Sequence, residues 1–207
     1  MPPGARIIDV AGDDAALADA ARGAEGAFIR FLPDGSSDLA RALGLGSTPP
    51  TGTTAAPVDL IDLGHGVTAA NVVVLGVAPD RLRRHHRARR VAVDIDGRSR
   101  IDDEATTVLI TNGQFLRGAD VAPRGHPGDG RIEVQVYALA PRDRREMRRR
   151  LARGDHVPHP QILEASGKRI SVQWYDSEQP VEVDGHPLST AGELGAVVLP
   201  AAAHVLL

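Results

Sequence analysis

The sequence predicts a mainly β protein of the α+β class, in which a small α/β unit precedes an antiparallel β-sandwich. With 207 residues, 42% of them hydrophobic, the chain is long enough for one large domain or for one domain with a small appendage. In its first part, short apolar runs alternate with helix-favouring runs and glycine-bearing turns, which is an α/β pattern. Further on, short runs of alternating apolar and polar residues follow at close spacing, which is typical of half-buried antiparallel strands.

The α/β unit is predicted to occupy residues 1–46. It reads as strand, helix, strand and helix at residues 6–10, 15–21, 27–32 and 39–43. Asp13 or Asp14 is placed to cap the first helix. Each helix N-terminus could receive an anion.

Residues 47–57 are rich in Thr, Pro and Ala and are predicted to form a linker. The β-sandwich is predicted to occupy residues 58–207. Its strands are predicted at residues 58–63, 70–77, 91–95, 106–111, 132–139, 169–174, 181–183, 196–199 and 204–207. One helix interrupts them, at residues 143–152, entered through Pro141 and ended by Gly154.

Composition limits the classes of protein to which the chain can belong. There is no cysteine, which excludes disulfides and thiolate metal sites. No apolar run approaches the roughly 18 residues of a membrane span, and the first residues do not read as a secretion signal. We therefore expect a soluble cytoplasmic protein. The net charge of -3 and the aromatic content of 3% argue against nucleic acid as a partner.

Arginine is concentrated in two segments. Six arginines lie in residues 81–90 and seven in residues 142–153, whereas Lys168 is the only lysine. In the predicted helix, the arginines form a broad face opposite Met147 and Leu151. This face is interpreted first as solvated surface. The alternative is attraction to an anionic membrane surface.

The segment between two predicted strands, residues 112–131, holds five glycines and two prolines. Such a loop, fixed between strands, is a candidate site, and the alternative is a long hairpin connection. Within it, Asp129 stands between Gly128 and Gly130, where its carboxylate is presented beside freely turning backbone.

Four stretches in order give the chain a resemblance to a known family. Residues 10–19 resemble the nucleotide motif Gly-Gly-Asp-Gly-Thr with its following helix, and residues 31–43 resemble a second phosphate turn. Residues 112–131 and 184–188 resemble the β-domain motifs Asn-Gly…Pro…Asp-Gly and Asp-Gly-Glu-Pro. Together they resemble the diacylglycerol kinase family, the soluble bacterial lipid kinases related to sphingosine kinase.

The resemblance implies specific roles for residues of both parts. The residues that would line the nucleotide phosphates are Gly12, Asp13, Gly35 and Ser36. A magnesium ion would be held by Asp129 with the backbone carbonyls of His126 and Arg131, and Asp129 would act with the catalytic group. His186 stands where the family has a glutamate that accepts the proton of the lipid hydroxyl, and a histidine could serve as that base.

The chain also departs from the family pattern. It starts just before the nucleotide motif, so we expect a truncated nucleotide lobe. Asp14 replaces a glycine there and brings a negative charge to the phosphates, and Ala15 removes a hydroxyl. The second turn is one residue short, and the family's helical insert is reduced to residues 80–90. These changes predict impaired ATP binding.

The resulting hypothesis is a lipid-kinase-like protein, close to a pseudokinase, with a β-domain pocket for a lipid or other hydrophobic small molecule. The alternatives are an active ATP-dependent phosphotransferase acting on a lipid-like hydroxyl, and a recruited enzyme of another kind that uses His186. We expect a homodimer, or a partner chain that completes the lobe. Simpler interpretations stay open: Asp13 as a helix cap, and Asp129 and His186 as turn residues.

Overall fold

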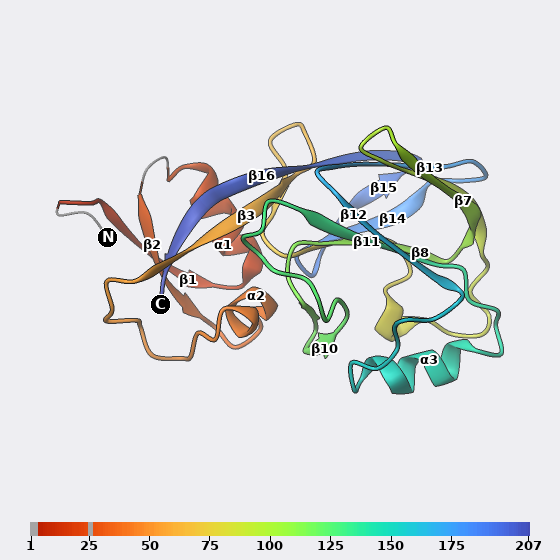
Figure 1. The fold of residues 1–207 in the computed structure, drawn as a ribbon, viewed down its shortest axis with the longest axis horizontal. Helices are drawn as coiled ribbons and strands as arrows, with labels where there is room; N and C mark the ends of the chain where they lie inside the picture. The colour runs from red at the N-terminus through yellow and green to blue at the C-terminus, as the bar shows by residue number, and fades with distance from the viewer. Residues whose placement is uncertain (1–3, 25–26) are drawn as a thin grey trace.

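The computed structural model describes residues 4–24 and 27–207. Its first part consists of β1 (Ile7–Gly12), α1 (Asp14–Arg22), β2 (Phe28–Pro33) and α2 (Asp38–Ala42). β1 and β2 pair in parallel with α1 as their crossover, as the α/β pattern predicts (Figure 1). Asp13 caps α1 and Ser37 caps α2, each by accepting a backbone N–H three residues on.

The larger part contains two sheets that pack face to face. The first sheet has eight strands and continues β1 and β2 through β16 (Glu193–Leu206), β13 (Arg169–Trp174), β6 (Arg89–Ile95) and β7 (Ser99–Ala105). β3 (Ala55–Asp62) also pairs with β16, and β4 (Thr68–Ala69) pairs with β3. The second sheet has the order β12 (Ile162–Gly167), β11 (Ile132–Tyr137), β8 (Thr107–Thr111), β5 (Val72–Gly76), β14 (Gln179–Val183) and β15 (His186–Ala191). A small hairpin, β9 (Phe115–Leu116) and β10 (Ala119–Asp120), completes the set.

The buried apolar residues form three clusters. One cluster fills the space between the two sheets and contains Trp174. A second lies under α1 and α2. The third covers the outer face of the second sheet, where α3 (Arg144–Leu151) and the short helix η1 (Pro79–Arg81) pack. The predicted α+β class, with its antiparallel β-sandwich, is confirmed.

The last strand joins the two parts of the chain. The sequence predicts strands at 196–199 and 204–207, but β16 runs from Glu193 to Leu206 with an irregularity between Leu199 and Ala203. Its first half pairs with β13, and its end pairs with β2 in parallel and β3 in antiparallel. β2 is therefore covered by the strand that also belongs to the sandwich.

Some strands carry no clear sequence signal. β7 reads Ser-Arg-Ile-Asp-Asp-Glu-Ala and is an edge strand, where charged residues are common because one side faces water. β15 is also an edge strand, and almost all of its residues are exposed. β3 starts at Ala55, so the predicted linker is partly strand. Within the described residues, no helix is long and apolar enough to cross a membrane.

Candidate functional site

A cavity of about 250 Å³ lies where the α/β unit meets the sandwich. From the α/β unit it is lined by Asp13, Asp14, Ser36 and Asp38. From the sandwich it is lined by Asn71, Val72, Leu116, Arg117, Asp184, Gly185 and His186. Four aspartates on one cavity make it strongly acidic, and Arg117 and His186 are the cationic groups that face them.

Asp13 and His186 meet at this cavity. Asp13 accepts the Ala16 N–H at 3.0 Å through Oδ1, and its Oδ2 lies 2.6 Å from Nε2 of His186. Burial raises the pKa of Asp13, but the hydrogen bonds to His186 and Ala16 outweigh it and hold the pKa below its usual value. The hydrogen bond and the negative charge of Asp13 raise the pKa of His186. The structure thus brings together two residues that the motifs singled out separately.

The Asp13–His186 pair has the arrangement of an acid–base dyad. A carboxylate that receives a hydrogen bond from one ring nitrogen fixes the orientation of the imidazole and stabilises its charged form. The side chain of His186 is 62% exposed, so solvent reaches the imidazole ring. Such a pair can accept and return a proton near neutral pH.

The carboxylate of Asp14 accepts hydrogen bonds from donors in the second turn and at the start of α2. Its carboxylate is buried, with the residue only 5% exposed, and accepts the Leu39 N–H at 3.2 and 3.3 Å and the Ser37 hydroxyl. Burial raises its pKa to about 6, opposed by these hydrogen bonds and supported by the nearby charge of Asp38. The donors at the start of α2, in the segment that resembles the second phosphate turn, are therefore bound by the protein's own carboxylate.

Asp184 begins the motif at residues 184–188, but its structural role in the site was not predicted from the sequence. It has a φ of 47° at the turn between β14 and β15, and its carboxylate accepts N–H groups of Ala70, Asn71 and Val72 at 2.7 to 2.9 Å. Burial raises its pKa to about 7 against these three bonds. The Asp-Gly pair is a turn signal, but no local pattern shows that its carboxylate is buried.

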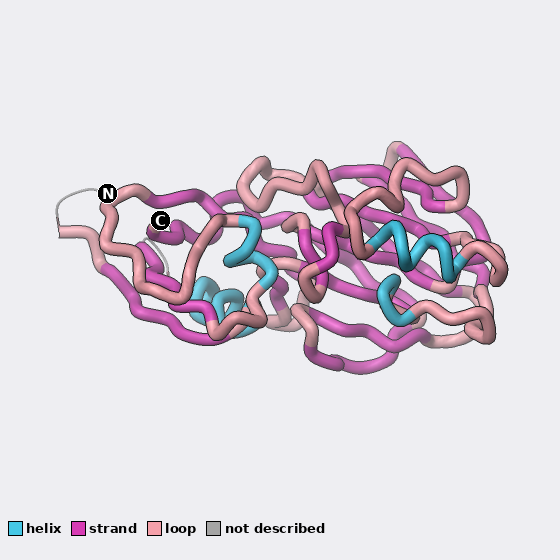
Figure 2. The backbone as a smooth tube through the Cα atoms, turned by 90° about the horizontal axis from the view of Figure 1, so that it is seen from below, coloured by secondary structure: helices cyan, strands magenta, loops and turns pink. Residues whose placement is uncertain are grey.

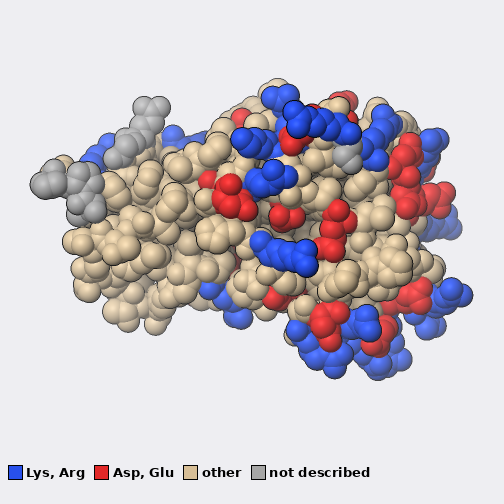
Figure 3. Space-filling view, in the orientation of Figure 1, with Lys and Arg blue, Asp and Glu red and all other residues tan. Residues whose placement is uncertain are grey.

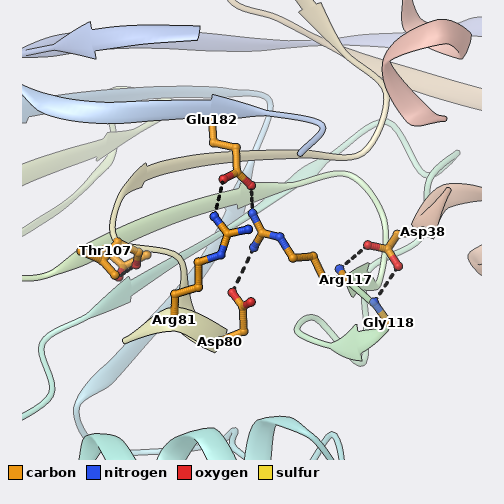
Figure 4. A network of polar contacts seen from close by, with 8 residues as sticks. Asp38, Asp80, Arg81, Thr107, Arg117, Gly118 and Glu182 are labelled. Atoms are coloured by element: carbon orange, nitrogen blue, oxygen red, sulfur yellow. Dashed lines mark hydrogen bonds and ion pairs between the residues drawn. The ribbon is translucent and has the colours of Figure 1, made fainter. Parts of the chain in front are cut away.

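Arg117 connects the cavity to both parts of the chain. Its backbone N–H and that of Gly118 donate to Asp38 of α2, so the β9–β10 turn is fixed to the α/β unit (Figure 4). Its guanidinium pairs with Asp80 at 3.0 Å and with Glu182, which also accepts from Arg81 at 3.5 Å. Arg117 is therefore held by carboxylates on the sandwich side of the cavity.

The other predicted phosphate residues lie near the cavity. Ser36 lines it, and its backbone N–H and hydroxyl both donate to Asp34, at 2.9 and 2.6 Å. Gly35 lines a neighbouring cavity of about 510 Å³. Gly12 has a φ of 137°, and a Cβ there would lie 2.9 Å from that of Ala16, so the turn before α1 requires glycine.

The predicted magnesium loop is placed elsewhere. Asp129 is exposed, and its Oδ1 accepts the Arg131 N–H at 2.9 Å, while the His126 carbonyl accepts the Asp129 N–H at 3.4 Å. The side chain of Arg131 points to Ser166 and donates to its carbonyl at 2.7 Å. Buried Asp59 anchors the loop by accepting the Gly130 N–H at 2.6 Å. Among the described residues, no three His, Asp or Glu side chains gather as a metal site, and magnesium here stays a prediction.

A larger cavity, of about 540 Å³, lies on the outer face of β11 and β12. Its polar wall contains Glu133, Gln135 and Glu164, and its apolar wall contains Ala122, Pro123, Val157, Pro158 and Ala165. Gln135 is fixed because it donates to the Val121 carbonyl at 2.8 Å and accepts from the Tyr137 hydroxyl at 2.7 Å. This cavity could hold a small molecule with both an apolar and a polar part.

Comparisons with known proteins give a family and a fold. Residues 71–207 match the model of the YegS C-terminal NAD kinase beta sandwich-like domain. A diacylglycerol kinase structure from Bacillus anthracis str. Sterne superposes with a TM-score of 0.78 at 19% identity, over 97% of this chain and 77% of that one. Another structure from the same organism gives 0.80 at 18% identity, with the same coverage.

An NAD kinase from Archaeoglobus fulgidus, in complex with ATP, superposes with a TM-score of 0.51 at 12% identity, over 97% of this chain and 77% of that chain. No curated protein has a sequence that matches this chain. At these identities, the structural likeness shows a shared fold.

Proposed function

The chain belongs to the family of the YegS C-terminal NAD kinase beta sandwich-like domain, and from this premise we propose that it is a lipid-kinase-like protein impaired in ATP binding. The predicted resemblance to the diacylglycerol kinases agrees with the family and with the shared fold. The observation that carries the proposal is the position of Asp14. Its carboxylate already accepts hydrogen bonds from Ser37 and Leu39, in the segment that resembles the second phosphate turn.

The charge around Asp14 supports the same proposal. Asp13, Asp38 and Asp184 line the same cavity, so a polyanion entering it would meet several carboxylates. Two like charges about 4 Å apart repel by about 4 kcal/mol at an effective dielectric of about 20. Binding of a triphosphate would therefore need protonation or rearrangement of these groups.

Calorimetric titration with Mg-ATP tests the proposal. We expect no binding by the natural chain at micromolar ATP, and measurable binding by Asp14→Gly, which frees the Leu39 N–H and removes the charge. Asp14→Asn is the second variant because it removes the charge and keeps the volume. Asp19→Gly, on the exposed face of α1, is the matched control and should not bind. Micromolar binding by the natural chain would overturn the proposal.

We infer further that the protein binds a lipid or other small molecule with an apolar part in the 540 Å³ cavity. The support is the apolar wall beside the fixed polar side chain of Gln135. Native mass spectrometry of the purified protein should show a retained ligand. Glu164→Trp, at an exposed position that lines the cavity, should remove it by filling the cavity, whereas Ser189→Trp, on exposed β15, should not. A natural chain without retained ligand would count against this assignment.

A second candidate is an enzyme that uses His186 as its base, as a kinase or in another reaction. The observation that favours it is the 2.6 Å contact between His186 and Asp13. Incubation with Mg-ATP and a mixed lipid extract should then give a phosphorylated product that His186→Ala abolishes. If the natural chain gives no phosphorylated product, the kinase form of this candidate is ruled out. A non-kinase reaction would instead show as substrate loss without ATP, again abolished by His186→Ala.

A further inference from the structure

The two arginine-rich segments, far apart in the sequence, form one surface in the fold. Residues 83–87 follow η1, and α3 packs against η1 (Figures 1 and 2). Leu82, Met147 and Leu151 are buried in the same cluster, so the polar sides of both segments are turned outward. The arginine surface is defined here as Arg83, Arg84, Arg87, Arg145 and Arg148.

Buried Arg144 holds the two segments together. Its guanidinium donates to the carbonyl of Leu139 at 3.1 Å and to the carbonyls of Arg83 and His86 at 3.0 and 2.5 Å. The residue is only 2% exposed. An arginine placed in the protein in this way has a structural role: it fixes the turn at 83–87 against α3 and sets the spacing of the exposed arginines.

The arginine surface has cationic groups without carboxylate partners. On α3, Arg149 and Arg150 pair with Glu146 at 3.6 and 3.9 Å. Within the described residues, none of the five arginines of the surface makes an ion pair. Burial together with the charges of Arg83 and Arg145 lowers the pKa of Arg148, which shows that these cations lie within each other's field. Such a surface attracts an anionic partner.

The shape and composition favour a membrane over a nucleic acid. α3 lies at the rim of the molecule, and at this lower edge Figure 3 shows many basic atoms interspersed with acidic ones. Neither residues 83–87 nor α3 contain a Phe, Tyr or Trp that could stack on bases, and the net charge of -3 opposes a polyanion that would wrap the chain. A rim of guanidinium groups fits a flat layer of phosphate headgroups.

We propose that the arginine surface formed by residues 83–87 and α3 docks the protein onto an anionic lipid bilayer. The attraction is peripheral and electrostatic. It does not depend on whether the nucleotide site or the 540 Å³ cavity is functional.

Co-sedimentation with vesicles tests the proposal. The natural chain should bind vesicles of phosphatidylglycerol and phosphatidylcholine in equal parts, and should not bind vesicles of phosphatidylcholine alone. Binding should be lost on raising the salt from about 0.1 M to about 1 M, because the Debye length falls from about 10 Å to about 3 Å. Equal binding to both kinds of vesicle, or none to the anionic kind, would overturn the proposal.

Charge reversal locates the surface. Arg84→Glu with Arg145→Glu, both at exposed positions, should weaken partitioning at least about thirtyfold. Arg98→Glu with Arg169→Glu makes the same change in net charge at exposed positions on other elements and should leave partitioning within about twofold. An equal loss in both pairs would refute the assignment to this surface. Binding of duplex DNA in place of anionic vesicles, abolished by the first pair, would refute the membrane as partner.

A fold check accompanies the charge reversal. Each variant should keep the thermal midpoint of the natural chain. If the first pair unfolds, Arg84→Gln with Arg145→Gln replaces it, with an expected weakening of about thirtyfold, and no weakening in that pair contradicts the proposal.

Discussion

Asp13 uses its two carboxylate oxygens for different purposes. One caps α1, as the simpler interpretation of the sequence has it, and the other contacts His186. The cap explains why an aspartate is favoured there. The second contact could not be predicted from the sequence, because the two residues are 173 positions apart and no local spacing sets their distance.

The pair predicts a pH dependence. His186 has a raised pKa, so its contribution to stability is complete below its unfolded pKa of about 6.5 and is lost as the pH rises through the folded value. Asp13 has a lowered pKa, so its contribution is present above about 3.9 and is lost as the pH falls through the folded value. The contact therefore stabilises the fold at pH values between the folded pKa of Asp13 and the folded pKa of His186.

Asp13→Asn should lower the pKa of His186, measured from its ring proton in an NMR titration. The charge that favours the imidazolium is removed, while a hydrogen-bonding side chain remains. Asp9→Asn, where the natural aspartate pairs with Arg30 on the exposed side of β1, is the control and should leave the titration unchanged. An unchanged pKa in Asp13→Asn would mean that the two side chains do not meet in solution.

Asp184 shows how a single buried carboxyl fixes the turn that carries His186. Asp184→Ala leaves the N–H groups of Ala70, Asn71 and Val72 without their acceptor. We expect a loss of roughly 3 kcal/mol in the free energy of unfolding, measured by urea denaturation.

That loss should vary with pH. The folded pKa of Asp184 is raised to about 7, so its contribution declines as the pH rises from about 4 towards 7, where the unfolded state ionises first. The difference between the natural chain and Asp184→Ala should thus be larger at low pH than at pH 8. The same or a larger difference at pH 8 would show that the carboxylate is ionised throughout.

At the scale of elements, the sequence predicts strands well where one face is buried and the alternation is clear, as in β11 and β13. Edge strands such as β7 and β15 are missed because their sequences show no clear alternation of apolar and polar residues. The position of Asp129 in a glycine-rich loop is readable from the sequence. Asp129 lies away from His186 because Asp59 of β3 anchors the loop by accepting the Gly130 N–H. This tertiary contact cannot be predicted from the local sequence.

The joint between α3 and residues 83–87 depends on Arg144. Arg144→Ala should lower the free energy of unfolding by about 3 kcal/mol, because it leaves the carbonyls of Leu139, Arg83 and His86 without their donor at a buried or partly buried position. Hydrogen exchange should also become faster at residues 83–87. Arg145→Ala, one position on and exposed, is the control and should change stability by less than about 0.5 kcal/mol. Equal effects would show that Arg144 is not the joint.

At the scale of the whole molecule, β16 makes the α/β unit and the sandwich parts of one sheet. Its residues pair with β13 at one end and with β2 and β3 at the other. Val205 is fully buried in the cluster under α1 and α2, and its partners across the sheet are Ile29 and Ala56. Trp174, the only tryptophan, is buried in the separate cluster between the two sheets.

Because Val205 and Trp174 lie in separate clusters, they can be used to measure whether the two parts of the chain unfold together. Val205→Ala should lower the free energy of unfolding by about 2 kcal/mol through the lost packing. Because β16 continues into the sandwich, Trp174 fluorescence and far-ultraviolet circular dichroism should shift to lower urea by the same amount. Val67→Ala, in a half-buried turn, is the control. The free energy of unfolding obtained from either signal should change by less than about 1 kcal/mol in this variant. If the fluorescence of Trp174 does not move with the circular dichroism in Val205→Ala, residues 1–46 unfold as a separate domain and β16 does not couple the two parts.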